Sequence, residues 1–124
     1  MKKKSLTSMG FAAAERSLRA TALRAIQLIE ARGFRQGKRG PGLCVGDAIA
    51  EADVEKKYRW TLWVRAESVI CATTRMRHGR GTPLIPRWND KPGRTKEEAI
   101  ALLQRVAKHD VPFTYRDFLG TVRA

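Results

Sequence analysis

The feature that most constrains this chain is a stripe of apolar residues at helical spacing near its start. In residues 12–32, "AAAERSLRATALRAIQLIEAR", the stripe repeats every three or four positions and consists of Leu18, Ala22, Ala25, Ile26 and Ile29. Gly33 follows directly, where a left-handed C-terminal cap belongs. Because such a stripe must be buried against another element, the pattern predicts a core-facing helix over residues 12–32.

A second strong helix signal lies in "TKEEAIALLQRVAK", residues 95–108. Thr95 and Glu98 have the spacing of a capping box, in which each side chain accepts a hydrogen bond from the other residue's backbone amide. Glu97 and Glu98 also lie near the positive end of the helix dipole. The predicted buried face of this helix consists of Ala99, Ile100, Leu102, Leu103 and Val106.

Three further helices are predicted. Residues 43–53 form a short one that buries Val45, Ala48, Ile49 and Ala52. Residues 54–77 fit helical spacing, although "RWTLWV" within them would also suit a strand. Thr114 and Asp117 resemble a capping box that starts a C-terminal helix, which would bury Phe118, Leu119 and Val122.

These elements predict a small all-α, single-domain bundle of about five helices with two loops rich in Gly, Pro and Arg. The domain is expected to span residues 12–124, after a basic and flexible N-terminus at residues 1–11. With 124 residues, 43% of them hydrophobic, the chain is long enough for one modest core.

The chain is expected to be cytoplasmic. Its short apolar start is interrupted by Thr7, Ser8 and Gly10, which does not suit an export signal. No run approaches the roughly 18 apolar residues that a membrane helix needs, so no membrane contact is predicted. Cys44 and Cys71 fit two buried, reduced thiols better than a disulfide framework.

The net charge of +13 is distributed unevenly along the chain. Residues 1–40 hold ten Lys and Arg against two acids, and residues 75–94 hold six against one. The remaining residues are nearly balanced. Such a surplus attracts polyanions or acidic surfaces, and its concentration in two segments predicts a contact surface rather than a general solubilising charge.

Within these segments the charge falls in two predicted loops, residues 31–42 and 75–94, which are rich in Gly and Pro. Arginine in glycine-spaced loops can offer its fork of donors to phosphates. The two loops and the lysine-rich start of the chain are expected to form one basic face. Its predicted contacts to nucleic acid or to an acidic partner are Arg35, Lys38, Arg39, Arg75, Arg77, Arg80 and Arg87.

Two aromatic groups have both a structural and a functional interpretation. Trp60 and Trp63 lie among basic residues and could stack nucleobases, although the same spacing is typical of a buried helix face, which is favoured. Trp88, Asn89 and Asp90 could form a recognition patch. The favoured interpretation is a structural turn, with Trp88 in the core and the two polar side chains closing the turn before the capped helix.

No catalytic or metal motif stands out. The Cys and His residues are spaced 27, 7 and 31 apart, which fits no familiar zinc pattern: Cys44, Cys71, His78 and His109. The acids are scattered or occupy helix caps, so clustered carboxylates for nuclease chemistry are not evident. We therefore expect no metal, no cofactor, no small-molecule substrate and no enzymatic activity.

Two segments resemble a family of small bacterial and phage domains of unknown function. They are "ARGFRQG" followed by "LCVGDAIAEA", and "WNDKPGRTKEEAIALLQRVA", within residues 20–52 and 87–108. The family pattern has an aromatic-x-Gln-Gly turn, a Cys-led short helix and a WNDxPGRTxEE segment. The chain departs from it with Phe34 where Trp is usual and Asp47 where Ala is usual. The resemblance implies a helical domain associated with phages or other mobile elements, and it implies no particular activity.

The expected function is that of a small, basic, non-enzymatic binding protein that contacts nucleic-acid phosphates or a nucleoprotein through an Arg-rich face. The alternative is a phage or mobile-element inhibitor, similar in kind to an anti-CRISPR protein, that binds a host protein complex. In the first case binding to nucleic acid should be largely independent of sequence and weaken steeply with salt.

Overall fold

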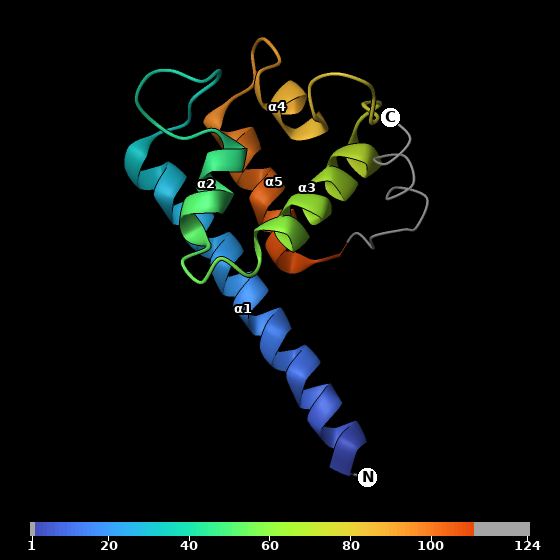
Figure 1. The fold of residues 1–124 in the computed structure, drawn as a ribbon. Coiled ribbons are helices and arrows are strands. Elements are labelled where there is room, and N and C mark those ends of the chain that lie inside the picture. The colour runs from blue at the N-terminus through green and yellow to red at the C-terminus, as the bar shows by residue number, and fades with distance from the viewer. Residues whose placement is uncertain (1, 111–124) are drawn as a thin grey trace.

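Five helices make up the described part of the chain, and α1 extends well beyond the others (Figure 1). The computed structural model describes the backbone of residues 2–110 and the side chains of residue 10 and residues 12–110. In chain order the helices are α1 (Lys2–Arg32), α2 (Val45–Ala52), α3 (Arg59–Thr73), α4 (Leu84–Asn89) and α5 (Lys96–Lys108). Among these residues there is no strand beyond one isolated bridge between Phe34 and Leu43. The predicted all-α class is confirmed.

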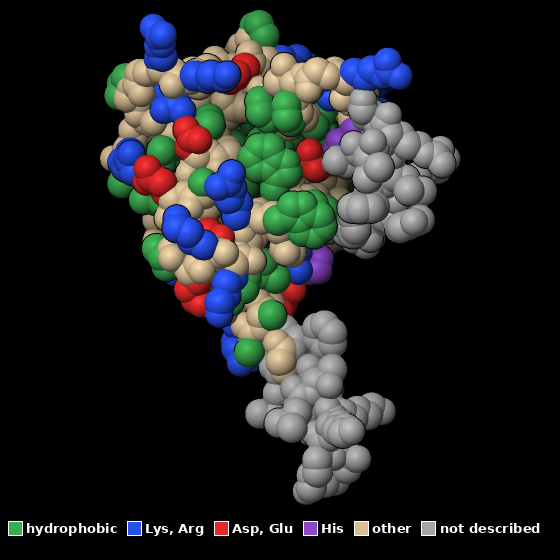
Figure 2. Space-filling model, viewed as in Figure 1, with side chains coloured by type: hydrophobic (Ala, Val, Ile, Leu, Met, Phe, Trp, Pro, Cys, Tyr) green, Lys and Arg blue, Asp and Glu red, His purple; other side chains and the backbone are tan. Residues whose placement is uncertain are grey.

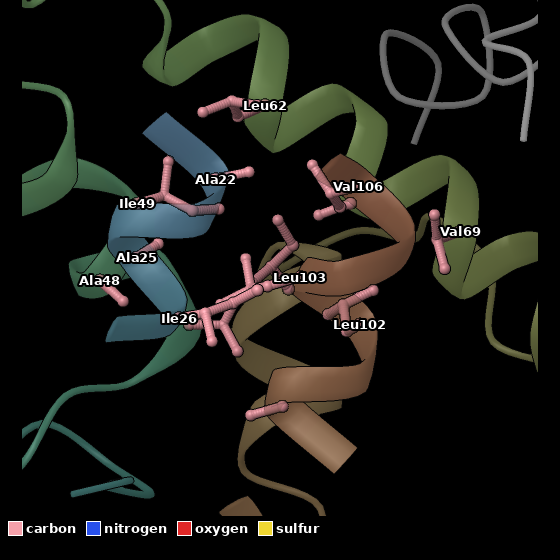
Figure 3. Packing of buried hydrophobic residues seen from close by; sticks show 14 of the residues in the cluster. Ala22, Ala25, Ile26, Ala48, Ile49, Leu62, Val69, Leu102, Leu103 and Val106 are labelled. Atoms are coloured by element: carbon pink, nitrogen blue, oxygen red, sulfur yellow. The ribbon is translucent and has the colours of Figure 1, made fainter. Parts of the chain in front are cut away.

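The core lies where α1, α2, α3 and α5 meet (Figure 3). The stripe predicted for α1 is buried, and Ala22, Ala25 and Ile29 are fully so. The small side chains of α1 allow α2 to lie close to it, while Leu103 of α5 reaches into the space between the helices (Figure 3). The residues predicted to be buried in α2 are all in the core as well.

The two strongest local signals act as the sequence predicts. Gly33 has a φ of 91°, and its amide bonds to the Ile29 carbonyl, so α1 ends in the predicted left-handed cap. In α5 both hydrogen bonds of the Thr95–Glu98 capping box are present. Helix α1 begins at Lys2, earlier than the predicted residue 12, while the predicted flexibility of residues 1–11 stays a prediction.

The segment "RWTLWV", which would suit either a helix or a strand, is part of helix α3. The helix starts at Arg59 because the buried carboxylate of Asp53 accepts the amides of Lys57, Tyr58 and Arg59 at 3.2, 3.0 and 2.8 Å. A carboxylate at this position satisfies amides that have no partner within the helix. The helix is therefore shorter than the predicted span of residues 54–77.

Helix α4 corrects the prediction that residues 75–94 form one continuous loop. Pro83 is its N-cap and Pro86 lies in its first turn, where a missing amide hydrogen costs no helical bond. The helix is held by burial of Leu84, Ile85 and Trp88 in the core. The prolines that suggested a loop are thus compatible with a short helix. The C-terminal helix predicted after Thr114 lies outside the described residues.

The connection between α1 and α2 is fastened to the end of α4 by residues far away in sequence. Asn89, which is 1% exposed, accepts a hydrogen bond from the Val45 amide at 2.9 Å and donates to the Arg35 carbonyl at 3.0 Å. Gln36 donates to the carbonyls of Asn89 and Lys91 at 3.1 and 2.7 Å. Asn89 therefore joins the start of α2, the connection and α4.

We expect replacement of Asn89 by Ala to lower the free energy of unfolding by about 2–4 kcal/mol, because it leaves the buried Val45 amide without a partner. Chemical denaturation followed by circular dichroism measures this loss. Replacement of the exposed Gln104 by Ala on α5 serves as the control and should change stability by less than about 0.5 kcal/mol. Equal stability of the two variants would contradict the role given to Asn89.

Candidate functional site

The two arginine-rich connections lie at the same end of the molecule, beside α4 (Figure 1). We call the connections of residues 33–44 and 74–83, together with the turn of residues 90–95, the basic end. Two hydrogen bonds of Gln36 and one from the Gly37 amide to Asp90, at 2.8 Å, join the first connection to the turn. The second connection leads directly into α4. Lys and Arg side chains line this end in the space-filling view (Figure 2).

Three of the seven predicted contact residues are bonded to their own chain. Arg35 donates to the carbonyls of Gly37 and Gly42 and to Asp47, the last at 2.5 Å, and its side chain is only 15% exposed. Arg77 donates to three carbonyls at and beyond the end of α3, which lack helical partners there. Arg87 donates to the Thr82 and Arg77 carbonyls. These three side chains shape the basic end.

The other four predicted contact residues are exposed: Lys38, Arg39, Arg75 and Arg80. They come in pairs from the two connections, and the described residues provide no hydrogen-bond or ion-pair partner for their side chains. Their charges are therefore directed to solvent at one end of the molecule. We call these four residues the exposed cations.

The lysine-rich start of the chain does not join the basic end. A helix of 31 residues such as α1 is about 45 Å long, and its first turn lies at the opposite end from the two connections (Figure 1). The idea that residues 2–4 add to one basic face with the two loops is thus corrected.

The two tryptophans of α3 differ in their surroundings. Trp60 is 63% exposed, which overturns the prediction that it is part of the core. The helix instead turns Leu62, Ala66, Val69 and Ile70 inward, and these fill the core more completely than an indole at position 60 could. Trp63 is partly buried and packs against the core.

Trp88, Asn89 and Asp90 are engaged in contacts within the fold. Trp88 is 5% exposed, and the guanidinium of Arg94 lies 3.9 Å from its ring centroid. Arg94 also donates to the Trp88 carbonyl and to Glu98, so it ties the turn to the start of α5. Hydrogen bonds from the Gly37 amide and from Asn89 hold the pKa of Asp90 below its ordinary value.

A cleft of about 330 Å³ opens beside the basic end, between the first connection, α2, α3 and α4. Its apolar lining includes Ala50, Trp63, Ile85 and Pro86. Hydrophobic side chains are gathered on this face over α3 and below α4, with basic side chains next to them (Figure 2). The cleft therefore combines an aromatic wall with cationic surroundings.

Gly46 makes the cleft wall possible. A Cβ atom at this position would lie 2.9 Å from the Trp63 ring, so any larger residue there would force the indole or α2 to shift. This close approach fixes the ring between α2 and α3. The requirement for glycine at the second position of α2 arises from the tertiary packing, because the helix itself would favour alanine.

Cys44 lies at the junction of the cleft and the basic end. It is the N-cap of α2, where its sulfur accepts the Asp47 amide at 3.4 Å, and it lines the cleft. Burial raises the pKa of the Cys44 thiol above its ordinary value. Because the thiolate is the reactive form, this environment disfavours a nucleophilic role.

A buried carboxylate lies behind Trp63. Glu67 is 5% exposed, and burial raises its pKa, while a hydrogen bond from Trp63 acts in the opposite direction. The nearest His78 nitrogen is 3.9 Å from a Glu67 oxygen. The pair connects α3 to the second connection of the basic end, and its burial suits a structural role for both side chains.

Within the described residues, no cluster of three or more Cys, His, Asp or Glu side chains could hold a metal ion. None of the helices between residues 2 and 110 combines the length and the apolar character needed to span a membrane. Neither Cys44 nor Cys71 forms a disulfide, and both are only partly buried.

Comparison with known proteins identifies a family. The sequence profile of DUF6197 matches residues 13–109, which include nearly all of the described structure. The chain belongs to DUF6197, a family of unknown function. The resemblance to an uncharacterised domain family is thus confirmed. Among the described helices of this DUF6197 member, the match covers α2 to α5 in full and α1 from residue 13 onward. No curated protein and no solved structure matches the chain.

Sequence reasoning missed Arg59 and the cleft itself. Arg59 is exposed at the start of α3 and lines the cleft together with Lys38, which lies 21 positions earlier in the chain. The sequence contained one usable signal, the alternation of basic and aromatic residues in "KKYRWTLW". Nothing in it indicated that the connection of residues 33–44 would lie across from this segment.

We expect the alkylation rate of Cys44, measured in a Cys71→Ser variant of this DUF6197 member, to rise with pH through a midpoint above that of the same thiol in denaturant. The raised pKa leaves less thiolate at any given pH in the folded protein. Iodoacetamide labelling followed by mass spectrometry over a pH series measures both midpoints. A folded-state midpoint at or below the denatured one would show that the thiol is activated.

Proposed function

We propose that this DUF6197 member binds the phosphate backbone of nucleic acids through the exposed cations of the basic end. The observation that carries the proposal is that two connections about 40 residues apart in sequence are held at one end of the bundle, each with two exposed cations. Lys38, Arg39, Arg75 and Arg80 are all exposed at this end, and no acidic residue in the described part of the chain pairs with them.

The hydrogen bonding of the other arginines supports this assignment. Arg35, Arg77 and Arg87 use their donors on backbone carbonyls, which holds both connections in shape. A surface that is fixed before binding loses less conformational entropy when a ligand binds. Phosphate contacts from such a surface position a nucleic acid without reading its bases, so binding should depend little on sequence.

The chemistry of the remaining groups favours binding over catalysis. The thiol of Cys44 has a raised pKa, and the buried Glu67 and His78 lie behind Trp63 rather than at the surface of the cleft. Cys44 lines the cleft together with Lys38, but its raised pKa is the opposite of what an activated nucleophile requires. The proposed activity is therefore non-enzymatic.

Reversal of the four exposed cations to Glu should weaken binding to a labelled duplex by about 100-fold or more at moderate salt, because each lost phosphate contact removes a released counterion. Fluorescence anisotropy over a salt series measures the association constant. It also gives the slope of the logarithm of that constant against the logarithm of the salt concentration. The slope should fall by about one for each residue reversed. Circular dichroism should show unchanged helicity, since these side chains have no partners in the described fold.

The matched control reverses four other exposed cations that lie away from the basic end: Arg16, Arg19, Lys57 and Lys108. It changes the net charge by the same amount, so a general loss of charge would affect both variants equally. We expect the control to retain most of the affinity and slope. Equal losses in the two variants would refute a site at the basic end, and unchanged binding of the first variant would refute phosphate contact through these residues.

A pull-down from host lysate, with and without nuclease, separates this proposal from the inhibitor alternative. Capture that disappears after nuclease treatment supports direct binding to nucleic acid. Retention of a single protein after nuclease treatment would instead favour an inhibitor that docks on a host complex.

A further inference from the structure

We infer that the cleft beside the basic end receives an unpaired nucleobase, so that the preferred ligand is a single-stranded nucleic acid. This inference rests on the proposed phosphate binding and adds to it the class of nucleic acid. It follows from three features of the cleft: an aromatic side chain, an apolar lining and two exposed cations, Lys38 and Arg59, that also line it.

Trp63 supplies the aromatic wall. The indole of Trp63 projects from α3 and packs closely against Gly46 of α2. The same side chain lines the cleft. The indole also lies beside the buried Glu67 carboxylate, where it acts to lower the pKa of Glu67. A rigidly held indole that faces a cavity is suited to stack a flat ring, and stacking of this kind accepts every base.

The floor of the cleft is formed by Ile85 and Pro86 of α4, with Ala50 of α2 beside them. Ile85 is 1% exposed, so this part of the lining belongs to the hydrophobic core. The small Ala50 side chain leaves room in front of Trp63. An apolar cleft of about 330 Å³ excludes water from a stacked ring and suits a base better than a charged group.

The rim carries charge that complements the phosphates on either side of such a base. Lys38 reaches it from the first connection and Arg59 from the start of α3, and both side chains are exposed. The two acids of the lining are already compensated. Asp47 is paired with Arg35, and Asp90 accepts hydrogen bonds from the Gly37 amide and from Asn89.

The same cleft disfavours duplexes. A base within a duplex is paired and stacked between its neighbours, and it would have to leave the helix to reach Trp63, at a free-energy cost that a single strand avoids. The exposed cations contact phosphates of either form. Preference for single strands should therefore depend on the cleft alone, while the overall affinity depends on the exposed cations.

The first test fills the cleft without changing charge. Wild-type protein should bind oligothymidylate about tenfold more tightly than a duplex of equal charge, and Ala50→Phe should abolish this preference while leaving duplex affinity within about twofold. The matched control is Ala20→Phe on the exposed surface of α1, which should retain the preference. Fluorescence anisotropy with labelled strands measures the six affinities, those of the three proteins for each of the two ligands.

The second test needs no change in the cleft. In the Cys71→Ser variant, oligothymidylate should slow the alkylation of Cys44, which lines the cleft, whereas an abasic strand of equal length should bind through its phosphates without protecting the thiol. Equal protection by both strands would overturn the inference, because phosphates alone would then cover Cys44. This measurement remains decisive even if Ala50→Phe fails to fold.

The outcomes distinguish the two proposals. Equal affinity for single strands and duplexes, unaffected by Ala50→Phe, would overturn the nucleobase inference and leave phosphate binding at the basic end intact. Loss of all nucleic-acid binding would overturn both. Protection of Cys44 by a captured host protein, but not by oligothymidylate, would assign the cleft to a protein side chain and also overturn the inference.

Discussion

The side-chain amide of Asn89 holds the arrangement on which the rest of the basic end depends. Through its oxygen it satisfies the first amide of α2, and through its nitrogen it holds the backbone at Arg35. Gln36 and Asp90 add bonds between the same two segments. Because Asn89 is buried and fully bonded, separation of these segments would expose unsatisfied polar groups, and the connection therefore stays beside α4.

This constraint explains why some basic residues hold the connections in shape while others stay exposed to solvent. A loop of glycines and arginines cannot bury much apolar surface, so its conformation must come from hydrogen bonds. The planar fork of Arg35 bonds two carbonyls and a carboxylate at once, which the point charge of a lysine could not do. Arginines used in this way are unavailable to a ligand. The number of basic residues in a loop thus overstates the number that can bind.

The cleft and the basic end have a common structural origin. The cleft is lined in part by the connection of residues 33–44, which belongs to the basic end, and Lys38 is part of both. Gly46 allows the Trp63 ring to approach α2 closely, and Ala50 leaves the space in front of it unfilled. A phosphate surface and a site for a flat ring are therefore placed side by side, the combination that single-stranded nucleic acids require.

The sequence by itself determined the buried stripe of α1, its glycine cap and the capping box of α5, since these signals act between residues a few positions apart. It did not determine α4, which is held by burial of Trp88 and its neighbours rather than by helical propensity. The inward face of α3 also depended on packing, which left Trp60 outside. Only the tertiary structure decided which cations stay free and that a cleft exists, because contacts such as Gln36 with Asn89 join residues 53 positions apart.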